Sequence, residues 1–239
     1  MTIFASAPPP VLFVTGIDTG VGKTVVTGLL ARFLQDRGLR VATQKPVQTG
    51  DNRLPGEDLR WHRRLMGVES LPEDAEGITC PYRFQLPASP HLAAGQEDAE
   101  IDPPVLDVAT ERLRQRYDVV LVEGAGGLLV PLRRDLTLGD YLVARLEKWG
   151  GKLVVVTTGR LGSINQTLLT LEAAASRNLP LAGLVVNHFV PAEPLLCRDA
   201  VSLFRDALDR YGRPGALVEM STTDLTAPPI PDFSPLWAS

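Results

Sequence analysis

A glycine-rich segment near the start of the chain has the residue types and spacing of a phosphate-binding loop. It follows the apolar run Val11–Val14 directly and reads Gly16-Ile17-Asp18-Thr19-Gly20-Val21-Gly22-Lys23-Thr24. A strand, a glycine turn and a Gly-Lys-Thr helix start aim backbone N–H groups at phosphate oxygens, and the helix N-terminus adds partial positive charge. Lys23 is expected to reach the β- and γ-phosphates, and Thr24 to bind Mg²⁺. The segment predicts that the chain binds a nucleoside triphosphate.

The segment is a variant of the usual P-loop pattern. Ile17 stands where that pattern has its first glycine, and Gly16 is one residue further back. The context favours the P-loop interpretation, because residues 25–34 are apolar at helical spacing and a second strand begins at Val41, as a βαβ unit requires. The alternative is a glycine turn that feeds a helix by chance.

Three later predicted strands also end in polar side chains. Lys45 ends the second strand, Glu123 the third, and Asn187-His188 the strand that begins at Leu181. The carboxyl ends of parallel strands converge on one edge of a sheet, so these groups are expected around the phosphate loop. Burying a lysine requires a polar partner, and a carboxylate there suits Mg²⁺. A snorkelling surface lysine and a solvated glutamate are the alternatives.

Other polar residues carry weaker signals. Asp58 begins a short predicted helix and is either a metal ligand or a helix cap. His91, in Ser89-Pro90-His91, is either a substrate-loop residue or, as we favour, a plain loop histidine. His62 and Trp61 are expected on a helix surface and in packing contacts.

Apolar runs alternate with amphipathic stretches along the 239 residues. Runs such as Val119–Val122 are apolar at every position, which is typical of a parallel sheet covered on both faces. We predict an α/β fold of P-loop NTPase type, a doubly wound, mostly parallel sheet with helices on both faces, in one domain spanning 1–239. The predicted strands are Val11–Thr15, Val41–Lys45, Val119–Glu123, Leu153–Thr158 and Leu181–Asn187. The predicted helices are Lys23–Arg37, Asp58–Met66, Pro104–Arg116, Leu138–Lys148, Ile164–Arg177 and Glu193–Tyr211.

The remaining segments are expected to be irregular. Residues 48–102 are rich in Pro, Gly and charge and predict long loops around short helices. Residues 1–10 and the Pro-rich residues 221–239 are expected to be extended termini.

Composition excludes several classes of protein. The net charge of -4 and the lack of a Lys/Arg block argue against a nucleic-acid partner. No apolar run reaches the length of a membrane span, and the start of the chain lacks the features of a signal peptide. Cys80 and Cys197 have neither CxxC spacing nor nearby histidines and are expected to be reduced thiols. These features predict a cytoplasmic protein.

Taken together, five motifs resemble the dethiobiotin synthetase family. They are Thr15–Thr24, Lys45-Pro46-Val47, Ser89-Pro90-His91, Val122–Gly127 and Leu161-Gly162-Ser163-Ile164-Asn165. They occur in the family's order between Val11 and His188. The phosphate loop alone is shared by many ATPases, and its combination with Lys-Pro-Val and Val-Glu-Gly-Ala-Gly-Gly is much more specific.

The resemblance implies a homodimeric, Mg²⁺-dependent ligase that uses ATP and CO₂ to close a cyclic urea on 7,8-diaminononanoate, a diamino acid. It implies that Lys45 and Lys23 are catalytic and that Mg²⁺ is held by Thr24, Asp58 and Glu123. The residues it assigns to ATP and its metal are Gly20, Val21, Gly22, Lys23, Thr24, Val25, Asp58, Glu123, Gly124, Ala125, Gly126, Asn187 and His188. Those it assigns to the diamino acid are Thr19, Thr49, Gly162, Ser163 and Asn165, the last three from the partner subunit.

Two departures from the family pattern bear on the nucleotide. Gly20 stands where some relatives carry Glu, which loosens the loop without removing a phosphate ligand. The segment Val218–Ser221 matches poorly in a region that family members use for the base, so the sequence leaves base selectivity open.

Other P-loop functions compete with this interpretation. Partitioning and septum-placing ATPases carry a lysine where this chain has Asp18, which counts against an ATPase switch. Ligases acting on corrin side chains are usually longer and carry a glutaminase domain with Cys and His, a context that Cys80 and Cys197 lack. A small-molecule kinase remains an alternative.

Overall fold

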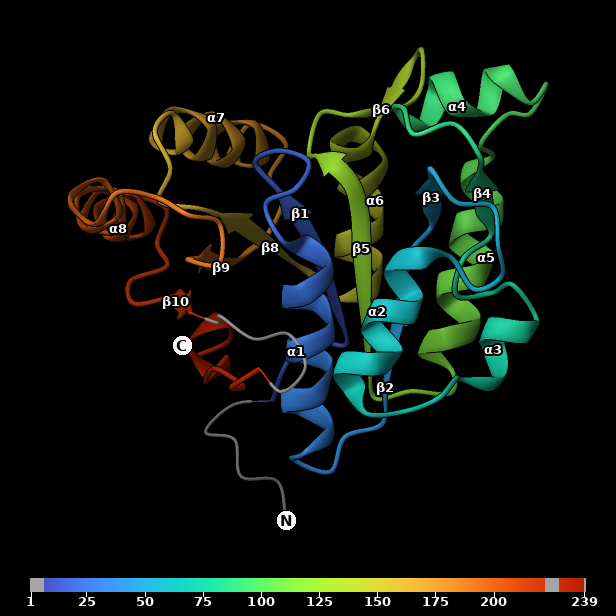
Figure 1. The fold of residues 1–239 in the computed structure, drawn as a ribbon, viewed down its shortest axis with the longest axis horizontal. Coiled ribbons are helices and arrows are strands. Elements are labelled where there is room, and N and C mark those ends of the chain that lie inside the picture. The colour runs from blue at the N-terminus through green and yellow to red at the C-terminus, as the bar shows by residue number, and fades with distance from the viewer. Residues whose placement is uncertain (1–6, 222–227, 239) are drawn as a thin grey trace.

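A six-stranded parallel sheet forms the centre of the computed structural model, which describes residues 7–221 and 228–238 (Figure 1). The strands lie in the order β10-β9-β8-β1-β5-β2, and every pairing between neighbours is parallel. The predicted doubly wound sheet is confirmed. Its strands are β1 (Val11–Gly16), β2 (Val41–Gln44), β5 (Val119–Gly127), β8 (Lys152–Thr157), β9 (Leu181–Asn187) and β10 (Leu217–Met220).

Side chains of each strand alternate between two separate cores. In β1, Val11 and Phe13 belong to one buried cluster, whereas Leu12 and Val14 belong to the cluster on the opposite face. A strand points successive side chains to opposite faces, so a sheet covered on both faces needs apolar residues at every position. This is why the strands read as continuous apolar runs.

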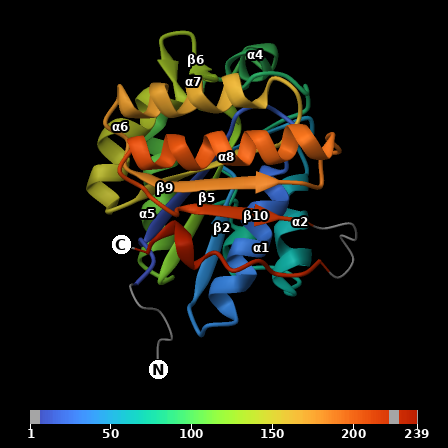
Figure 2. The same cartoon turned by 90° about the vertical axis from the view of Figure 1, so that its left-hand side faces the viewer.

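Helices cover both faces of the sheet. The helix α1 (Lys23–Gln35) packs on one face with α2 (Glu57–Met66) against it. The other face is covered by α5 (Pro103–Arg114), α6 (Leu138–Trp149), α7 (Ser163–Ala175) and α8 (Pro194–Arg210). Figure 2 shows α7 and α8 running side by side, with β9 beside them. None of the helices within 7–221 and 228–238 is long and apolar enough to cross a membrane.

The segment 48–102 contains more regular structure than the predicted long loops. It holds α2, α3 (Pro72–Ala75) and α4 (Pro90–Gln96), and it pairs β3 (Val47–Thr49) with β4 (Tyr82–Phe84) in parallel. His91 lies in the first turn of α4, so the prediction of a loop histidine is wrong. Beyond it, β6 (Pro131–Arg133) and β7 (Leu136–Thr137) pair in an antiparallel ribbon.

Four of the five predicted strand ends are shifted. The strand β1 ends one residue later than predicted, at Gly16, and β8 ends one residue earlier, at Thr157. The strand β2 stops at Gln44, because the backbone N–H of Lys45 leaves the ladder and donates to the Thr79 carbonyl at 2.8 Å. The strand β5 continues past Glu123, and its glycines allow Gly127 to pair with Gly16.

The Pro-rich tail is not simply extended, and that prediction is wrong for the part that the structure describes. Residues Ser234–Leu236 form a short 3-10 helix. Phe233 and Trp237 are buried and pack their rings against Phe33 of α1 at centroid distances of 5.6 and 6.0 Å. The tail therefore completes the core on the α1 face. Residues 1–6, 222–227 and 239, which share the predicted extended termini, lie outside the described residues.

Candidate nucleotide and substrate site

The glycine-rich segment forms the connection between β1 and α1. Gly20 and Gly22 have φ values of 75° and 95°, a left-handed conformation that glycine adopts without strain. Lys23, the first residue of α1, folds back so that its Nζ donates to the Asp18 carbonyl at 2.8 Å. The result is a turn of backbone at a helix N-terminus with an ammonium above it, which is an anion site.

Asn187, at the end of β9, supports this loop from beneath. Its Nδ2 donates to the Val21 carbonyl at 2.9 Å, and its Oδ1 accepts from the Phe189 N–H at 3.0 Å. A Cβ built on Gly22 would lie 2.1 Å from that Nδ2, so the close approach of Asn187 also requires glycine at position 22. The neighbouring His188 lies 3.0 Å from Glu219 through its Nε2. The adenine contacts of both residues stay predictions.

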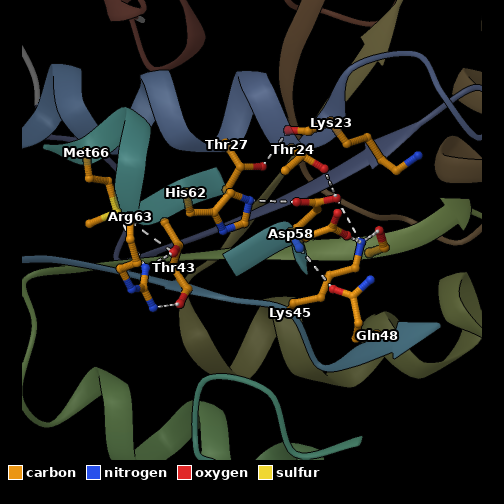
Figure 3. Close-up of polar contacts among 12 residues, drawn as sticks. Lys23, Thr24, Thr27, Thr43, Lys45, Gln48, Asp58, His62, Arg63 and Met66 are labelled. Atoms are coloured by element: carbon orange, nitrogen blue, oxygen red, sulfur yellow. Dashed lines mark hydrogen bonds and ion pairs between the residues drawn. The ribbon is translucent and has the colours of Figure 1, made fainter. Parts of the chain in front are cut away.

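Lys45 lies between two carboxylates. Its Nζ is 2.7 Å from Asp58 Oδ2 and 2.8 Å from Glu123 Oε1, and it also donates to the Gly124 carbonyl at 3.1 Å (Figure 3). Lys45 and Glu123 are 5 % and 1 % exposed. A surface lysine and a solvated glutamate, the two alternatives from the sequence, are therefore wrong.

Asp58 comes to this cluster from the first turn of α2. The helix is capped by Gly56 without a side-chain cap, so the alternative role of Asp58 as a cap is wrong. Thr24 of α1 completes the group, because its hydroxyl donates to Glu123 Oε1 at 3.0 Å. The three predicted metal-binding residues thus converge on one point.

Burial and charge act against each other in the pKa values of this cluster. Burial alone would lower the pKa of Lys45, but the charges of Glu123 and Asp58 hold it above its ordinary value. Burial alone would raise the pKa of Glu123, but Lys45 and the His62 hydrogen bond hold it well below its usual range. Both groups are therefore charged. Burial, helped by the nearby charge of Lys45, lowers the pKa of Lys23 to about 8.

His62 is a member of the charge cluster that the sequence did not predict. It was expected on a helix surface, but it is 0 % exposed and its Nε2 lies 2.7 Å from Glu123 Oε2. The prediction is wrong because the face of α2 that carries His62 packs toward Glu123 of β5. The available signal was its spacing: His62 follows Asp58 by one helical turn and so shares its face.

A cavity of about 660 Å³ opens beside the cluster. Predicted residues along its wall are Thr19, Gly20, Gly22, Lys23, Thr24, Lys45, Thr49, Asp58, Glu123, Ala125 and Gly126. The wall also contains Gln48, Glu57, Val130 and residues 87–90. Within 87–90, only Ser89 and Pro90 belong to a motif identified in the sequence. One chamber therefore joins the phosphate loop, the Lys45 cluster and Thr49.

Several predicted residues lie outside this wall. Val21 is buried in the core on the α1 face, Val25 packs against that core, and Gly124 approaches Leu138 and Phe13. Gly162, Ser163 and Asn165 form the start of α7, where Gly162 has a φ of 91° and the buried Ser163 Oγ has no hydrogen-bond partner among the described residues. A role for these three toward the substrate of a partner subunit stays a prediction.

A parallel sheet with a strand–loop–helix phosphate site after its central strand defines a P-loop nucleotide-binding protein. The likeness to a solved structure agrees on the fold: the signal recognition particle 54 kDa protein from Aeropyrum pernix K1 in complex with GDP aligns with a TM-score of 0.57 and 18% identity, over 99% of this chain and 46% of that chain. The family model described as AAA domain matches residues 11–221.

Curated relatives place the chain more narrowly. It is 47% identical over 220 residues to the ATP-dependent dethiobiotin synthetase BioD of Chlorobaculum tepidum, covering 92% of this chain and 90% of that protein. It is 43% identical to the ATP-dependent dethiobiotin synthetase BioD 2 of Haemophilus influenzae, covering 79% and 96%. The chain belongs to the dethiobiotin synthetase family.

Proposed function

We propose that this protein is an ATP-dependent dethiobiotin synthetase, a ligase of biotin synthesis that joins 7,8-diaminononanoate and CO₂. The observation that carries the proposal is the position of Lys45, a buried ammonium 2.7 and 2.8 Å from two carboxylates on the wall of the chamber that also contains the phosphate loop. The names of the relatives support the same activity.

The phosphate loop supplies the ATP side of the chamber. The backbone at Gly20 and Gly22 and the N-terminus of α1 attract phosphate oxygens. Lys23 adds a charge that is released from the Asp18 carbonyl when phosphates offer a stronger partner. ATP is therefore proposed to lie with its γ-phosphate toward Lys45.

The residues present fit Mg²⁺, which would be held by Thr24, Asp58 and Glu123. All three offer oxygen, the donor that Mg²⁺ prefers, and the position between the two carboxylates already attracts a cation, the Lys45 ammonium. Two carboxylates and a hydroxyl would leave positions on the ion for phosphate oxygens and water, which is how Mg²⁺ is usually bound beside a nucleotide. The bound ion would supply positive charge at the phosphates.

The reaction needs positioning and charge stabilisation. One amine of the substrate combines with CO₂ to give a carbamate, whose oxygen attacks the γ-phosphorus of ATP and expels ADP. The second amine then attacks the carbon of the carbamic–phosphoric anhydride, phosphate leaves, and the ring closes. Lys23 and Lys45 face the oxygens that gain negative charge, and no covalent enzyme nucleophile is needed.

The diamino acid is proposed to enter beside Thr49 and Thr19. We infer a homodimer in which the start of α7 of one subunit, at Gly162, Ser163 and Asn165, receives the carboxylate of substrate bound in the other. A helix N-terminus is an anion site, and the neighbouring Leu161 is 80% exposed, as a residue awaiting a partner surface would be. A location in the cytoplasm is part of the same proposal.

Product analysis tests this function. The protein is incubated with ATP, Mg²⁺, the diamino acid and isotope-labelled bicarbonate, and the products are weighed by mass spectrometry. A cyclic urea carrying the labelled carbon supports the proposal. ATP hydrolysis without any new urea contradicts it and favours an ATPase switch, and a phosphorylated diamino acid favours a small-molecule kinase.

A further inference from the structure

The carboxylate of Glu123 has different partners on its two oxygens. Oε1 accepts hydrogen bonds from Lys45 Nζ at 2.8 Å and from Thr24 Oγ1 at 3.0 Å. Oε2 lies 2.7 Å from Nε2 of His62. A carboxylate oxygen accepts hydrogen bonds, so Nε2 is the ring nitrogen placed to donate to it. Oε1 therefore contacts the site residues Lys45 and Thr24, whereas Oε2 contacts His62.

Packing alone does not explain a histidine at position 62. The side chain is completely buried, and its Nδ1 has no hydrogen-bond partner among the residues that the structure describes. A buried polar atom without a partner is destabilising, whereas an apolar side chain of similar size would fill the same space without that cost. The favourable contact of the ring is the one with Glu123.

Helix α2 is placed so that it can hold this contact firmly. Its Asp58 binds Lys45, and one turn later its His62 binds Glu123, so two residues on one helix face hold the two central charges (Figure 3). The helix lies close to α1 at Gly28, where a Cβ would come within 2.7 Å of Leu65 Cδ1. This close packing fixes His62 relative to Thr24 on α1.

We propose that His62 is a positioning residue that fixes the carboxylate plane of Glu123 and keeps Oε1 turned toward Thr24 and the bound cation. The inference rests on the proposed function, which assigns Glu123 to Mg²⁺. Groups that hydrogen-bond to a metal-binding carboxylate orient it, and their loss typically weakens metal affinity by about 10–100-fold.

Two substitutions separate the hydrogen bond from the packing. His62→Leu keeps an apolar side chain of similar size and removes the donor, and it is expected to weaken cation binding by about 10–100-fold. His62→Gln offers an amide N–H at the end of a comparable chain, and it is expected to restore most of the affinity. The matched control is Leu208→Ala, a buried residue of α8 on the opposite face of the sheet, which is expected to lower Tm and leave cation binding unchanged.

The measurement is binding of Mn²⁺, followed by its electron paramagnetic resonance signal, to the full chain with a non-hydrolysable ATP analogue. Tm is recorded for each variant, and His62→Met replaces His62→Leu if the latter does not fold. Weak binding in the apolar variant and recovery in His62→Gln support the proposal. It is overturned if His62→Leu binds Mn²⁺ like the parent protein, or if His62→Gln binds as weakly as His62→Leu.

A further variant separates two possible errors: a wrong positioning role for His62, and a wrong assignment of Glu123 to the metal. Glu123→Gln removes the charge of the proposed metal-binding carboxylate itself and is expected to bind Mn²⁺ more weakly than any His62 variant. If Glu123→Gln loses Mn²⁺ while His62→Leu keeps it, the metal site stands and the positioning role is wrong. If Glu123→Gln keeps Mn²⁺, the metal assignment is wrong and the role of His62 is wrong with it.

Discussion

Two buried charge clusters lie beside helix α2, and the adjacent residues His62 and Arg63 each point into one of them (Figure 3). The cluster of Lys45, Asp58 and Glu123 lines a chamber of about 660 Å³. The cluster of Arg63 and Asp74 lies away from that chamber, and both residues are 2 % exposed. Two buried charge clusters beside the same helix therefore occupy an open environment and a closed one.

The closed cluster is fully paired. Arg63 binds Asp74 through Nε and Nη2 at 2.8 and 2.6 Å, and its other N–H groups reach Thr43 and Met66. Asp74 also accepts from the Thr79 hydroxyl and the Leu71 N–H. Such satisfied, two-pronged pairing is what a buried charge needs in order to hold a fold together.

The open cluster, Lys45, Asp58 and Glu123, is not closed off in this way, because it borders the chamber. Asp58 is partly exposed, and Lys45 and Lys23 face a cavity large enough for substrates. The difference indicates that the open cluster is arranged for ligands and the closed cluster for stability. Substitutions in the two clusters are expected to change different quantities.

The largest expected effect is on stability, in the closed cluster. Asp74→Asn leaves the Arg63 charge buried without its partner and is expected to cost about 3–5 kcal/mol of unfolding free energy. Urea denaturation near neutral pH measures this loss, and kcat of the folded variant is expected to match that of the parent protein. A loss below about 1 kcal/mol, or a matching loss of kcat, would break the comparison.

The same variant has a defined pH dependence. The hydrogen bonds and charge of Arg63 outweigh burial and hold the pKa of Asp74 below its ordinary value of 3.8. The stabilisation is therefore complete above that value and is lost as the pH falls through the lower pKa of the folded state. The stability gap between parent and Asp74→Asn is expected to be constant near neutral pH and to close only in acid. A gap that closes at neutral pH would contradict this.

The next effect is on turnover, in the open cluster. Lys45→Ala removes an ammonium proposed to face the carbamate and its phosphorylated successor. It is expected to cost about 3–4 kcal/mol in the barrier, or roughly a hundredfold or more in kcat. Lys152→Ala, at the start of β8, is the matched control and is expected to keep normal turnover. Near-normal kcat in Lys45→Ala would contradict the catalytic role proposed for Lys45.

A smaller effect concerns pH and Lys23. Because burial and Lys45 lower the pKa of Lys23 to about 8, its ammonium is lost as the pH rises through that value. The charged form binds phosphate, so ATP affinity is expected to be constant below about pH 7 and to fall by up to about tenfold per pH unit above 8. Calorimetric titration with a non-hydrolysable ATP analogue measures this. Affinity that is flat to about pH 9.5 would contradict the assignment.

The smallest expected effect is at Thr49 on the chamber wall. Thr49→Ser keeps the hydroxyl and removes one methyl group, so kcat/KM for the diamino acid is expected to change by no more than about twofold. Thr49→Ala removes the hydroxyl and is expected to raise KM more than Thr49→Ser does. Equal KM values for the two variants would remove Thr49 from the substrate site.

The sequence predicted the sheet and the phosphate loop because both depend on local pattern. Continuous apolar runs such as Val119–Val122 identify buried parallel strands, and Gly-Lys-Thr after a strand identifies the loop. Lys45 and Glu123 were found because strand ends converge in this fold.

The sequence could not predict contacts that depend on how elements pack. The spacing of His62 to Asp58 indicates a shared helix face, but the burial of His62 depends on the approach of α1 and α2 at Gly28, which no local pattern reveals. The strand β10 and the packing of Phe233 and Trp237 on Phe33 depend on a distant partner surface. Composition alone therefore suggested an extended tail where the chain instead adds to the core.

The central claim is that the open cluster performs ATP-dependent ring closure. It is tested most directly by phosphate release from MgATP, measured with and without the diamino acid and bicarbonate. We predict that release requires both compounds and that Lys45→Ala loses it while Asp74→Asn retains it. Release that is indifferent to the diamino acid would contradict the account.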